Sequence, residues 1–349
     1  LMAHLSAHPT RQGIERVLEG LECMDHRTGI VAQESDGVGL MVDLPRDLWA
    51  EHVGAHAYAP NFWVAHLFVP TESAEESLSQ IRTILQSDGW RLLAQRLHAV
   101  NSSALGASAR GSEPRFVQIA GLLPESEPHP ERALFQRQLQ IERETPAHVV
   151  SLSRWQAVYK VHGGARTLYA YYPDLQNPKL SSAITIGHSR YSTNTLPAFH
   201  RVQPFSLLAH NGEINTIDRL RREARMLGVQ LCADASDSQD TDRLLHHLVI
   251  AYSLSLSEAM EILFPPVWAQ VARLPEPRRT LYRHLRAFLG PVAQGPAAII
   301  ARWGDCCVFA TDALGLRPLW LIPTEEGLYV SSERASLPLE IFTADPFPL

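Results

Sequence analysis

The sequence predicts an α+β fold in which antiparallel sheet carries helices on its faces. Apolar residues recur at helical spacing in 11–23 and 75–85, as expected for amphipathic helices packed on a flat surface. Between and after these segments come short runs rich in β-branched and aromatic residues. These runs are GVGLMVDLP, HVVSLSRWQAVYKV, SAITIGHSRYS, FSLLAHNGEI, AAIIARWGDCCVFATD and GLYVSSE.

The remaining segments are predicted from their turn-forming residues and from the spacing of their apolar residues. Residues 92–144 are rich in Ser, Gly and Pro, which predicts long connections or an insertion there. Helical spacing returns over 241–263, and a further helix is predicted between that segment and the last strands.

Composition bounds the class of function. The chain has 349 residues, 45% of them hydrophobic and 19% charged, which suits one large globular domain or two intimate ones. Its net charge of -6 and lack of a basic segment disfavour nucleic acid or an anionic membrane as a partner, so a small-molecule substrate is expected. The longest apolar runs are shorter than a bilayer span and no leader opens the chain, so we expect a soluble, cytoplasmic protein.

Cysteine and histidine spacing predicts no metal site. The four cysteines, Cys23, Cys232, Cys306 and Cys307, show no ligand spacing and are expected to be reduced thiols. Among these four thiols, Cys232 is the best candidate for a nucleophile, although a weak one. The pair at 246–247 has no second ligand pair, which predicts one surface and one boundary position on a helix. The chain starts with Leu1, so its true amino terminus is not visible.

Arg190 is a candidate for binding a carboxylate. It lies in HSRYST directly after a run predicted to be a buried strand, so its guanidinium should emerge at a strand end. A rigid two-pronged donor there suits the α-carboxylate of an amino acid better than a lysine does. The alternative is a structural arginine that pairs with a carboxylate at the edge of the core.

Asn211 and Gly212, in HNGEIN, are candidates for an oxyanion hole. They supply a side-chain amide and an unobstructed backbone N–H, the two kinds of donor that such a site uses. The alternative is a hairpin turn, because Asn-Gly is the strongest signal for a type I′ turn.

Asp237, in ASDSQDTD, is a candidate for binding a substrate ammonium group. Ser236, Asp237 or Ser238 can equally be the N-cap of the following helix, and capping is expected for at least one of them. Asp240 and Asp242 are most simply acids in the first turn of that helix.

Several long motifs resemble one family in their order and spacing. They are MDHRTG, VNSSALGASARGSEPR, SLSRWQAVYK, YYPDLQNP, GHSRYSTNTLPAFHRVQPFSLLAHNGEINTI, SDSQDTD, and ALGLRPLWLI with the following SSE. The chain resembles, over 1–336, the glutamine amidotransferase domain that opens the large subunit of glutamate synthase. That domain is a class II amidotransferase with the N-terminal-nucleophile (Ntn) hydrolase fold.

The resemblance implies a fold and a nucleophile. The fold is a four-layer αββα sandwich of two antiparallel sheets, with one domain over 1–340 and a tail or linker over 341–349. In the family, the mature chain starts with a catalytic cysteine shortly before a segment similar to LMAH at Leu1–His4. The nucleophile is therefore expected ahead of Leu1, where the free α-amino group of a terminal cysteine can act as general base.

The resemblance also assigns roles to individual residues. Arg190 would bind the α-carboxylate of glutamine and Asp237 its α-ammonium group, while Asn211 and Gly212 would stabilise the oxyanion. Two residues of the RYST segment, Tyr191 and Thr193, would line the glutamine pocket, and Arg27 would lie near the nucleophile.

The sequence departs from the family at two places. Thr28 stands where the family usually has Gly after His-Arg, and AQGPAA at 293–298 replaces a usual Trp-Asp-Gly-Pro segment. Both changes lie near expected site or channel elements, so they bear on efficiency and on the coupling partner more than on the fold.

The expected function is release of ammonia from L-glutamine through a cysteinyl thioester, feeding a synthase site outside this chain. FMN and an iron-sulfur cluster are expected only in that synthase region, and no cofactor in this chain. One alternative is a non-catalytic glutamine-binding or regulatory module without the terminal cysteine. The other is a stand-alone glutaminase subunit that serves a different acceptor.

Overall fold

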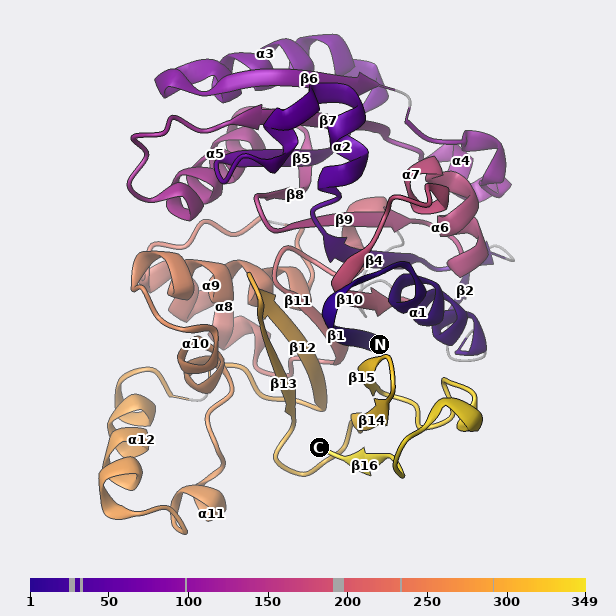
Figure 1. Ribbon diagram of the computed structural model, residues 1–349. Coiled ribbons are helices and arrows are strands. Elements are labelled where there is room, and N and C mark those ends of the chain that lie inside the picture. Colours follow the sequence, from indigo (N-terminus) through magenta and orange to yellow (C-terminus); the bar gives the residue numbers. More distant parts are fainter. Residues whose placement is uncertain (25–28, 32–33, 98, 191–197, 233, 291) are drawn as a thin grey trace.

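The computed structural model describes residues 1–24, 29–31, 34–97, 99–190, 198–232, 234–290 and 292–349 (Figure 1). Its largest sheet consists of strands that pair antiparallel with their neighbours. In spatial order they are β16 (Phe347–Pro348), β14 (Trp320–Thr324), β15 (Gly327–Ser331), β1 (Met2–Thr10), β10 (Ser182–His188), β4 (Val38–Asp43) and β9 (Gln156–Val161).

The second layer of strands is divided into two smaller antiparallel sheets. One has the order β6 (Arg91–Leu97), β7 (Arg115–Leu122), β5 (Phe62–Val69) and β8 (His148–Ser153). The other has the order β11 (Leu208–Gly212), β12 (Ala297–Trp303) and β13 (Cys306–Thr311). A small hairpin of β2 (Ile30–Val31) and β3 (Glu34–Ser35) lies apart from both.

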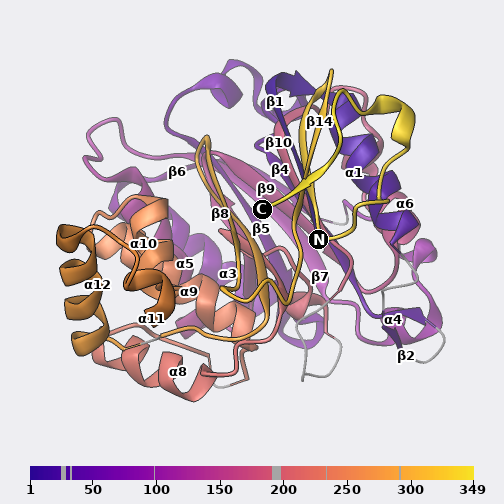
Figure 2. The same ribbon diagram turned by 90° about the horizontal axis from the view of Figure 1, so that it is seen from below.

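Helices cover the outer faces of the two strand layers (Figures 1 and 2). The helices up to residue 176 are α1 (Arg11–Cys23), α2 (Arg46–Val53), α3 (Ala74–Gln86), α4 (Ala107–Gly111), α5 (Pro130–Glu144), α6 (Ala165–Tyr171) and α7 (Pro173–Gln176). The later ones are α8 (Ile217–Met226), α9 (Asp237–Ala251), α10 (Leu256–Leu263), α11 (Trp268–Val271) and α12 (Glu276–Phe288).

Alternation along the strands decides which layer each side chain meets. Trp63, Ala65 and Leu67 of β5 belong to the core formed with α3 and α5, whereas Phe68 packs into the core of the largest sheet. In β12, Ile299 packs with α9 and α10 while its neighbours face the largest sheet. Helix α1 contacts β1 and β10 on the other face of that sheet. The predicted α+β four-layer sandwich is therefore confirmed.

Helix α1 has the predicted bounds, and its apolar stripe is buried. Thr10 begins it, because the Thr10 hydroxyl accepts a hydrogen bond from the Gly13 N–H at 3.1 Å. The predicted helix over 241–263 is wrong as a single element. Ser253 has a positive φ of 54°, and Ser255 and Glu258 form a capping box that starts α10 afresh.

The segment 92–144 contains more regular structure than its composition predicts. Strands β6 and β7 and helix α5 account for much of it. The Ser, Gly and Pro residues gather in the connections around 99–114 and 123–129, and RFVQIAGL between them is a buried strand. The Ser, Gly and Pro content thus predicted the connections correctly, but it did not predict the short strand between them.

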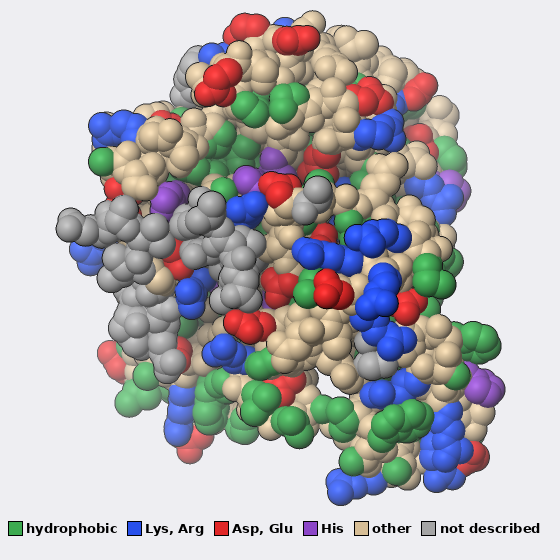
Figure 3. Space-filling model, turned by 180° about the vertical axis from the view of Figure 1, so that it is seen from behind, with side chains coloured by type: hydrophobic (Ala, Val, Ile, Leu, Met, Phe, Trp, Pro, Cys, Tyr) green, Lys and Arg blue, Asp and Glu red, His purple; other side chains and the backbone are tan. Residues whose placement is uncertain are grey.

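One face of the molecule carries charges of both signs (Figure 3). On the face shown in Figure 3, Lys and Arg side chains lie among Asp and Glu side chains instead of forming one basic patch. Helices α11 and α12 form a lobe that stands away from the rest of the chain. In the part of the chain that the structure describes, no helix is long and apolar enough to cross a membrane.

Candidate functional site

A pocket of about 790 Å³, partly open to solvent, lies where the ends of β10 and β11 meet the start of β1. It brings together three residues predicted from two separate motifs, namely Arg190 from HSRYST and Asn211 and Gly212 from HNGEIN. The other lining residues are Leu1, Met24, His188, Ser189, Gln203, His210, Arg317, Ser332 and Glu333. Residues from distant parts of the chain therefore converge on one site.

Arg190 lies two residues beyond β10, as predicted for a group that emerges at a strand end. Its Nε lies 3.2 Å from Oδ2 of Asp36. The Arg190 side chain is 43% exposed, whereas that of Asp36 is 1% exposed. One edge of the guanidinium is thus held by a buried carboxylate, and the group as a whole still reaches the pocket.

Asn211 and Gly212 end strand β11 and pair with Ala298 and Ala297 of β12. The hairpin-turn alternative is therefore wrong, because the partner strand comes from far along the chain. Gly212 has a φ of 144°, and a Cβ atom there would lie 1.8 Å from the carbonyl oxygen of Pro296. Only glycine fits this position, and it places its backbone against the pocket.

Asp237 is the first residue of α9 and does not line the pocket itself. Its Oδ2 accepts the Ile214 N–H at 3.0 Å, and its Oδ1 accepts the Ser238 N–H at 2.7 Å. The first bond ties the start of α9 to the residues just after Gly212. Ser236 caps the helix in a capping box with Gln239, as expected for one of these side chains.

Asp240 lies in the first turn of α9, as predicted, whereas Asp242 does not. Asp240 is buried in an ion pair with Arg221. Asp242 accepts the backbone N–H groups of Leu207 and Leu208, at 2.7 and 3.0 Å, which links α9 to the start of β11. Asp242 is therefore a buried support for the site strand and not a first-turn acid.

Some predicted site residues cannot be placed. Tyr191, Thr193 and Arg27 lie outside the described residues. Their assignments stay predictions.

Two histidines and a glutamine, none of them predicted as site residues, hold β10 and β11 together. The Gln203 amide donates to the His210 carbonyl at 2.8 Å and accepts the His210 N–H at 2.7 Å. His188 Nε2 lies 3.1 Å from the same carbonyl, and because a carbonyl only accepts, Nε2 carries the proton. The neutral ring then accepts the Arg190 N–H at Nδ1, at 3.0 Å. The motifs GHSR and HNGE contain both histidines, so the signal was present but unassigned.

Burial explains why these rings are neutral. It lowers the pKa of His188 well below its ordinary value and lowers that of His210 to about 4. Neither ring is charged at neutral pH. The His188 ring connects backbone groups at the strand ends that carry Arg190 and Asn211, whereas the His210 ring bonds the Ser238 hydroxyl of α9 at 3.0 Å.

We expect Gln203→Ala to lower the free energy of unfolding by about 2 kcal/mol, because the buried His210 N–H loses its acceptor and the His210 carbonyl loses one of its side-chain donors. Chemical denaturation measures this. Gln12→Ala is the matched control, since the Gln12 amide bonds Glu326 at an exposed site. Equal stabilities for the two variants would contradict a structural role for the Gln203 bonds.

None of the described cysteines lines the pocket. Burial raises the pKa of Cys232 and raises that of Cys307 to about 12, so neither thiol is activated. Within the described residues, no group of three or more His, Cys, Asp or Glu side chains is arranged to hold a metal ion.

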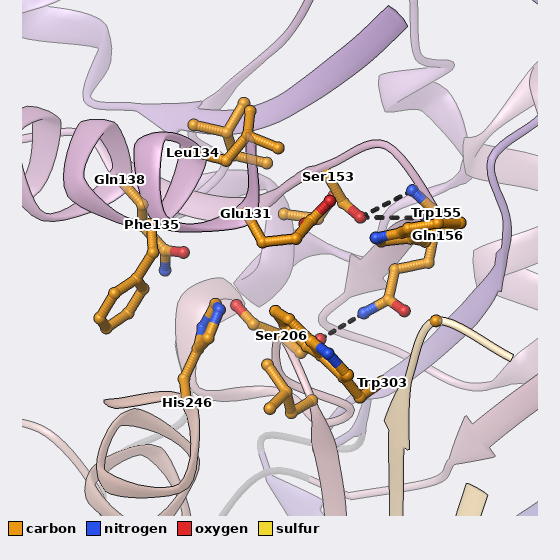
Figure 4. Close-up of a pocket in the computed structure, with 14 residues that line it drawn as sticks. Glu131, Leu134, Phe135, Gln138, Ser153, Trp155, Gln156, Ser206, His246 and Trp303 are labelled. Carbon is orange, nitrogen blue, oxygen red and sulfur yellow. Dashed lines mark hydrogen bonds between the residues drawn. The ribbon is translucent and has the colours of Figure 1, made fainter. Parts of the chain in front are cut away.

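A second cavity lies between α5, the β8–β9 turn and β12, away from this pocket (Figure 4). His246 lines it and packs between Phe135 and Trp303, with ring centroids 4.1 and 5.4 Å away. Burial lowers the pKa of His246 to about 3. The predicted surface or boundary position is wrong for His246, because α9 packs this face against α5.

Comparison with known proteins gives a family match over nearly the whole chain. A family model described as "Glutamine amidotransferases class-II" matches residues 1–342. "Ferredoxin-dependent glutamate synthase 2, chloroplastic" of Arabidopsis thaliana is 30% identical over 97% of this chain and 23% of its own length. "Glutamate synthase [NADPH] large chain" of Azospirillum brasilense is 27% identical over 96% of this chain and 24% of its own.

"Glutamate synthase [NADH]" of Schizosaccharomyces pombe is 27% identical over 91% of this chain and 17% of its own length. The chain thus spans about a quarter or less of the curated relatives that it matches.

Proposed function

The chain belongs to the class II glutamine amidotransferase family, and we propose that it releases ammonia from the side-chain amide of L-glutamine through a cysteinyl thioester. The observation that carries the proposal is the convergence of Arg190, Asn211 and Gly212 on one pocket. A guanidinium suits a carboxylate, and a side-chain amide next to a backbone N–H suits an oxyanion. These are the groups that binding and hydrolysis of an amino-acid amide require.

The nucleophile in this proposal is a cysteine ahead of Leu1. In support, Leu1 lines the pocket beside Asn211 and Gly212, and its nitrogen donates to the Ser332 hydroxyl at 3.3 Å. Residues joined to Leu1 would therefore enter the pocket. The internal thiols lie elsewhere, so none of them competes for the role.

The reaction would proceed in two steps. The thiolate attacks the amide carbon of glutamine, the C–N bond breaks, and the proton taken from the thiol by the terminal amine leaves on ammonia. Water then attacks the thioester, releasing glutamate and returning the thiol. Asn211 and Gly212 would stabilise the negative charge on the amide oxygen in both steps.

Substrate binding would divide between two charged groups. Arg190 would hold the α-carboxylate, and Asp237, whose Oδ2 accepts the Ile214 N–H just after Gly212, would hold the α-ammonium group. Tyr191, Thr193 and Arg27 remain part of the proposal as pocket residues. No resident cofactor is proposed for this chain.

The nucleophile is tested by an intact mass and peptide map of the natural protein before and after a glutamine-mimicking diazoketone. An adduct on a cysteine ahead of Leu1 supports a working glutaminase. A protein that lacks this cysteine and takes up no label supports the non-catalytic glutamine-binding module instead.

We expect Asn211→Ala to lower kcat about 100-fold with little change in KM, because one donor to the oxyanion is lost while the clamps on the substrate stay. Glutamate release from L-glutamine measures both constants. A variant that mainly raised KM would show that Asn211 binds the ground state instead.

The acceptor of ammonia would lie outside this chain. We propose a glutamate-synthase type of site in a synthase domain or subunit, where FMN and an iron-sulfur cluster would act, and a cytoplasmic location. The relatives support the synthase site, though not the location, since they carry the name glutamate synthase and are several times longer. A stand-alone glutaminase with another acceptor is the alternative, and isolation of the natural protein with its partner would separate the two.

A further inference from the structure

Asp36 is a buried carboxylate beside the pocket that no motif identified. It lies between β3 and β4, and 1% of its side chain is exposed. Its Oδ2 accepts from Arg190 Nε at 3.2 Å, across 154 positions of sequence. Among the described residues, its Oδ1 has no hydrogen-bond partner.

The backbone around Asp36 is built to admit this contact. The Asp36 N–H donates to the Gly29 carbonyl at 2.9 Å, which closes a tight loop around the hairpin of β2 and β3. A Cβ atom on Gly29 would lie 2.3 Å from Asp36 Oδ2 and 3.2 Å from Nη2 of Arg190. The absence of a side chain at Gly29 thus lets the carboxylate and the guanidinium meet.

Burial of the Asp36 carboxylate lowers the stability of the fold. Burial raises the pKa of Asp36, and the nearby Arg190 guanidinium only partly opposes this. Backbone hydrogen bonds of Gly29 and of Asp36 itself also favour the charged carboxylate, yet the net shift of the Asp36 pKa is upward. The contacts therefore offset only part of the free energy lost by burying this charge, and the ion pair is a poor source of stability.

We propose that Asp36 is a positioning residue for substrate binding, which holds the Nε edge of Arg190 so that Nη1 and Nη2 face the α-carboxylate of glutamine. The inference rests on the proposed function of the pocket. An arginine can bind a carboxylate through Nε and one Nη or through both Nη atoms. Because Asp36 takes the Nε, it selects the second geometry and aims the guanidinium into the pocket.

The test is the Kd of L-glutamine, measured by calorimetry on the chain as it stands, because binding needs no nucleophile. We expect Asp36→Ala to weaken binding about tenfold or more, and Asp36→Asn to weaken it less, since the amide oxygen can still accept from Nε. In an Arg190→Lys background, Asp36→Asn should change Kd less than about twofold, because lysine has no Nε edge to hold.

Asp43→Asn is the matched control. Asp43 forms another ion pair between a carboxylate and an arginine, with 2.5 Å between its Oδ1 and Nη2 of Arg302; here the arginine is the buried partner, and Asp43 is 23% exposed. Neither residue lines the pocket. Asp43→Asn should lower the free energy of unfolding and leave Kd unchanged. An Asp36→Ala variant that loses stability but keeps the wild-type Kd would overturn the proposal.

A second readout separates this inference from the proposed function. In the protein without ligand, the Nε–H proton of Arg190 should be protected from exchange in NMR spectra, and Asp36→Ala should remove this protection. Arg190→Lys assigns the signal. If the wild-type chain binds no glutamine, the proposed function fails, while the Nε–H signal still decides whether Asp36 orients Arg190. An unprotected Nε–H in the wild type would overturn the positioning role.

Discussion

Gly212→Ala is expected to lower kcat for glutamine hydrolysis by more than about 1,000-fold, the largest effect that we predict for any single substitution. The added Cβ would lie 1.8 Å from the Pro296 carbonyl oxygen, and the φ of 144° disfavours any side chain. The end of β11 must therefore move, and both proposed oxyanion donors, Asn211 and Gly212, move with it. Glutamate release by the natural protein measures the effect.

Gly228→Ala is the matched control for backbone strain. Gly228 also has a positive φ, of 78°, but a Cβ atom there meets nothing within 4 Å. Strain alone should cost about 1–3 kcal/mol of stability at either glycine. Circular dichroism and thermal unfolding establish that both variants fold. A folded Gly212→Ala variant with the kcat of Gly228→Ala would remove the oxyanion assignment.

Arg190→Lys is expected to weaken glutamine binding about 100-fold or more, because a single ammonium group cannot make two parallel hydrogen bonds to a carboxylate. It also cannot keep the contact with Asp36 while reaching the substrate. Calorimetric Kd values for L-glutamine measure the change without requiring catalysis.

Arg96→Lys is the control for losing a two-pronged arginine elsewhere. Arg96 bonds both oxygens of Asp174, at 3.0 and 3.1 Å, away from the pocket. This variant should lose stability and keep its Kd. Arg317 also lines the pocket, so Arg317→Lys provides a second comparison. If it weakened binding and Arg190→Lys did not, the carboxylate clamp would be assigned to the wrong arginine.

Sequence patterns were sufficient to predict a helix where the interactions that form it join residues close together in the chain. The apolar stripe of 11–23 and the hydroxyl of Thr10 define α1, because helix bonds and caps join residues three or four apart. The same holds for Ser236 and Gln239 at the start of α9. Periodicity failed at Ser253, where the pattern continued across a break that the next capping box created.

Each site motif was recognised separately, but the residues of a motif alone were compatible with both a functional and a structural role. Asn-Gly is a turn in many chains, and here it ends a strand only because Ala298 and Ala297 lie opposite. Arg190 could have paired entirely within the core, and its exposed edge became visible only beside Asp36 and the pocket. The resemblance to a family favoured the functional interpretation before the structure was considered.

What the sequence by itself determined was the class of fold, the helix with a local cap, and the three motif residues that meet in the pocket. The tertiary structure alone decided the parts played by Asp36, Gln203 and Asp242. Each is a single polar residue whose role comes from a partner distant in sequence or from another element. Such pairings leave no periodic trace, since they depend on which strand ends the packed sheets bring together.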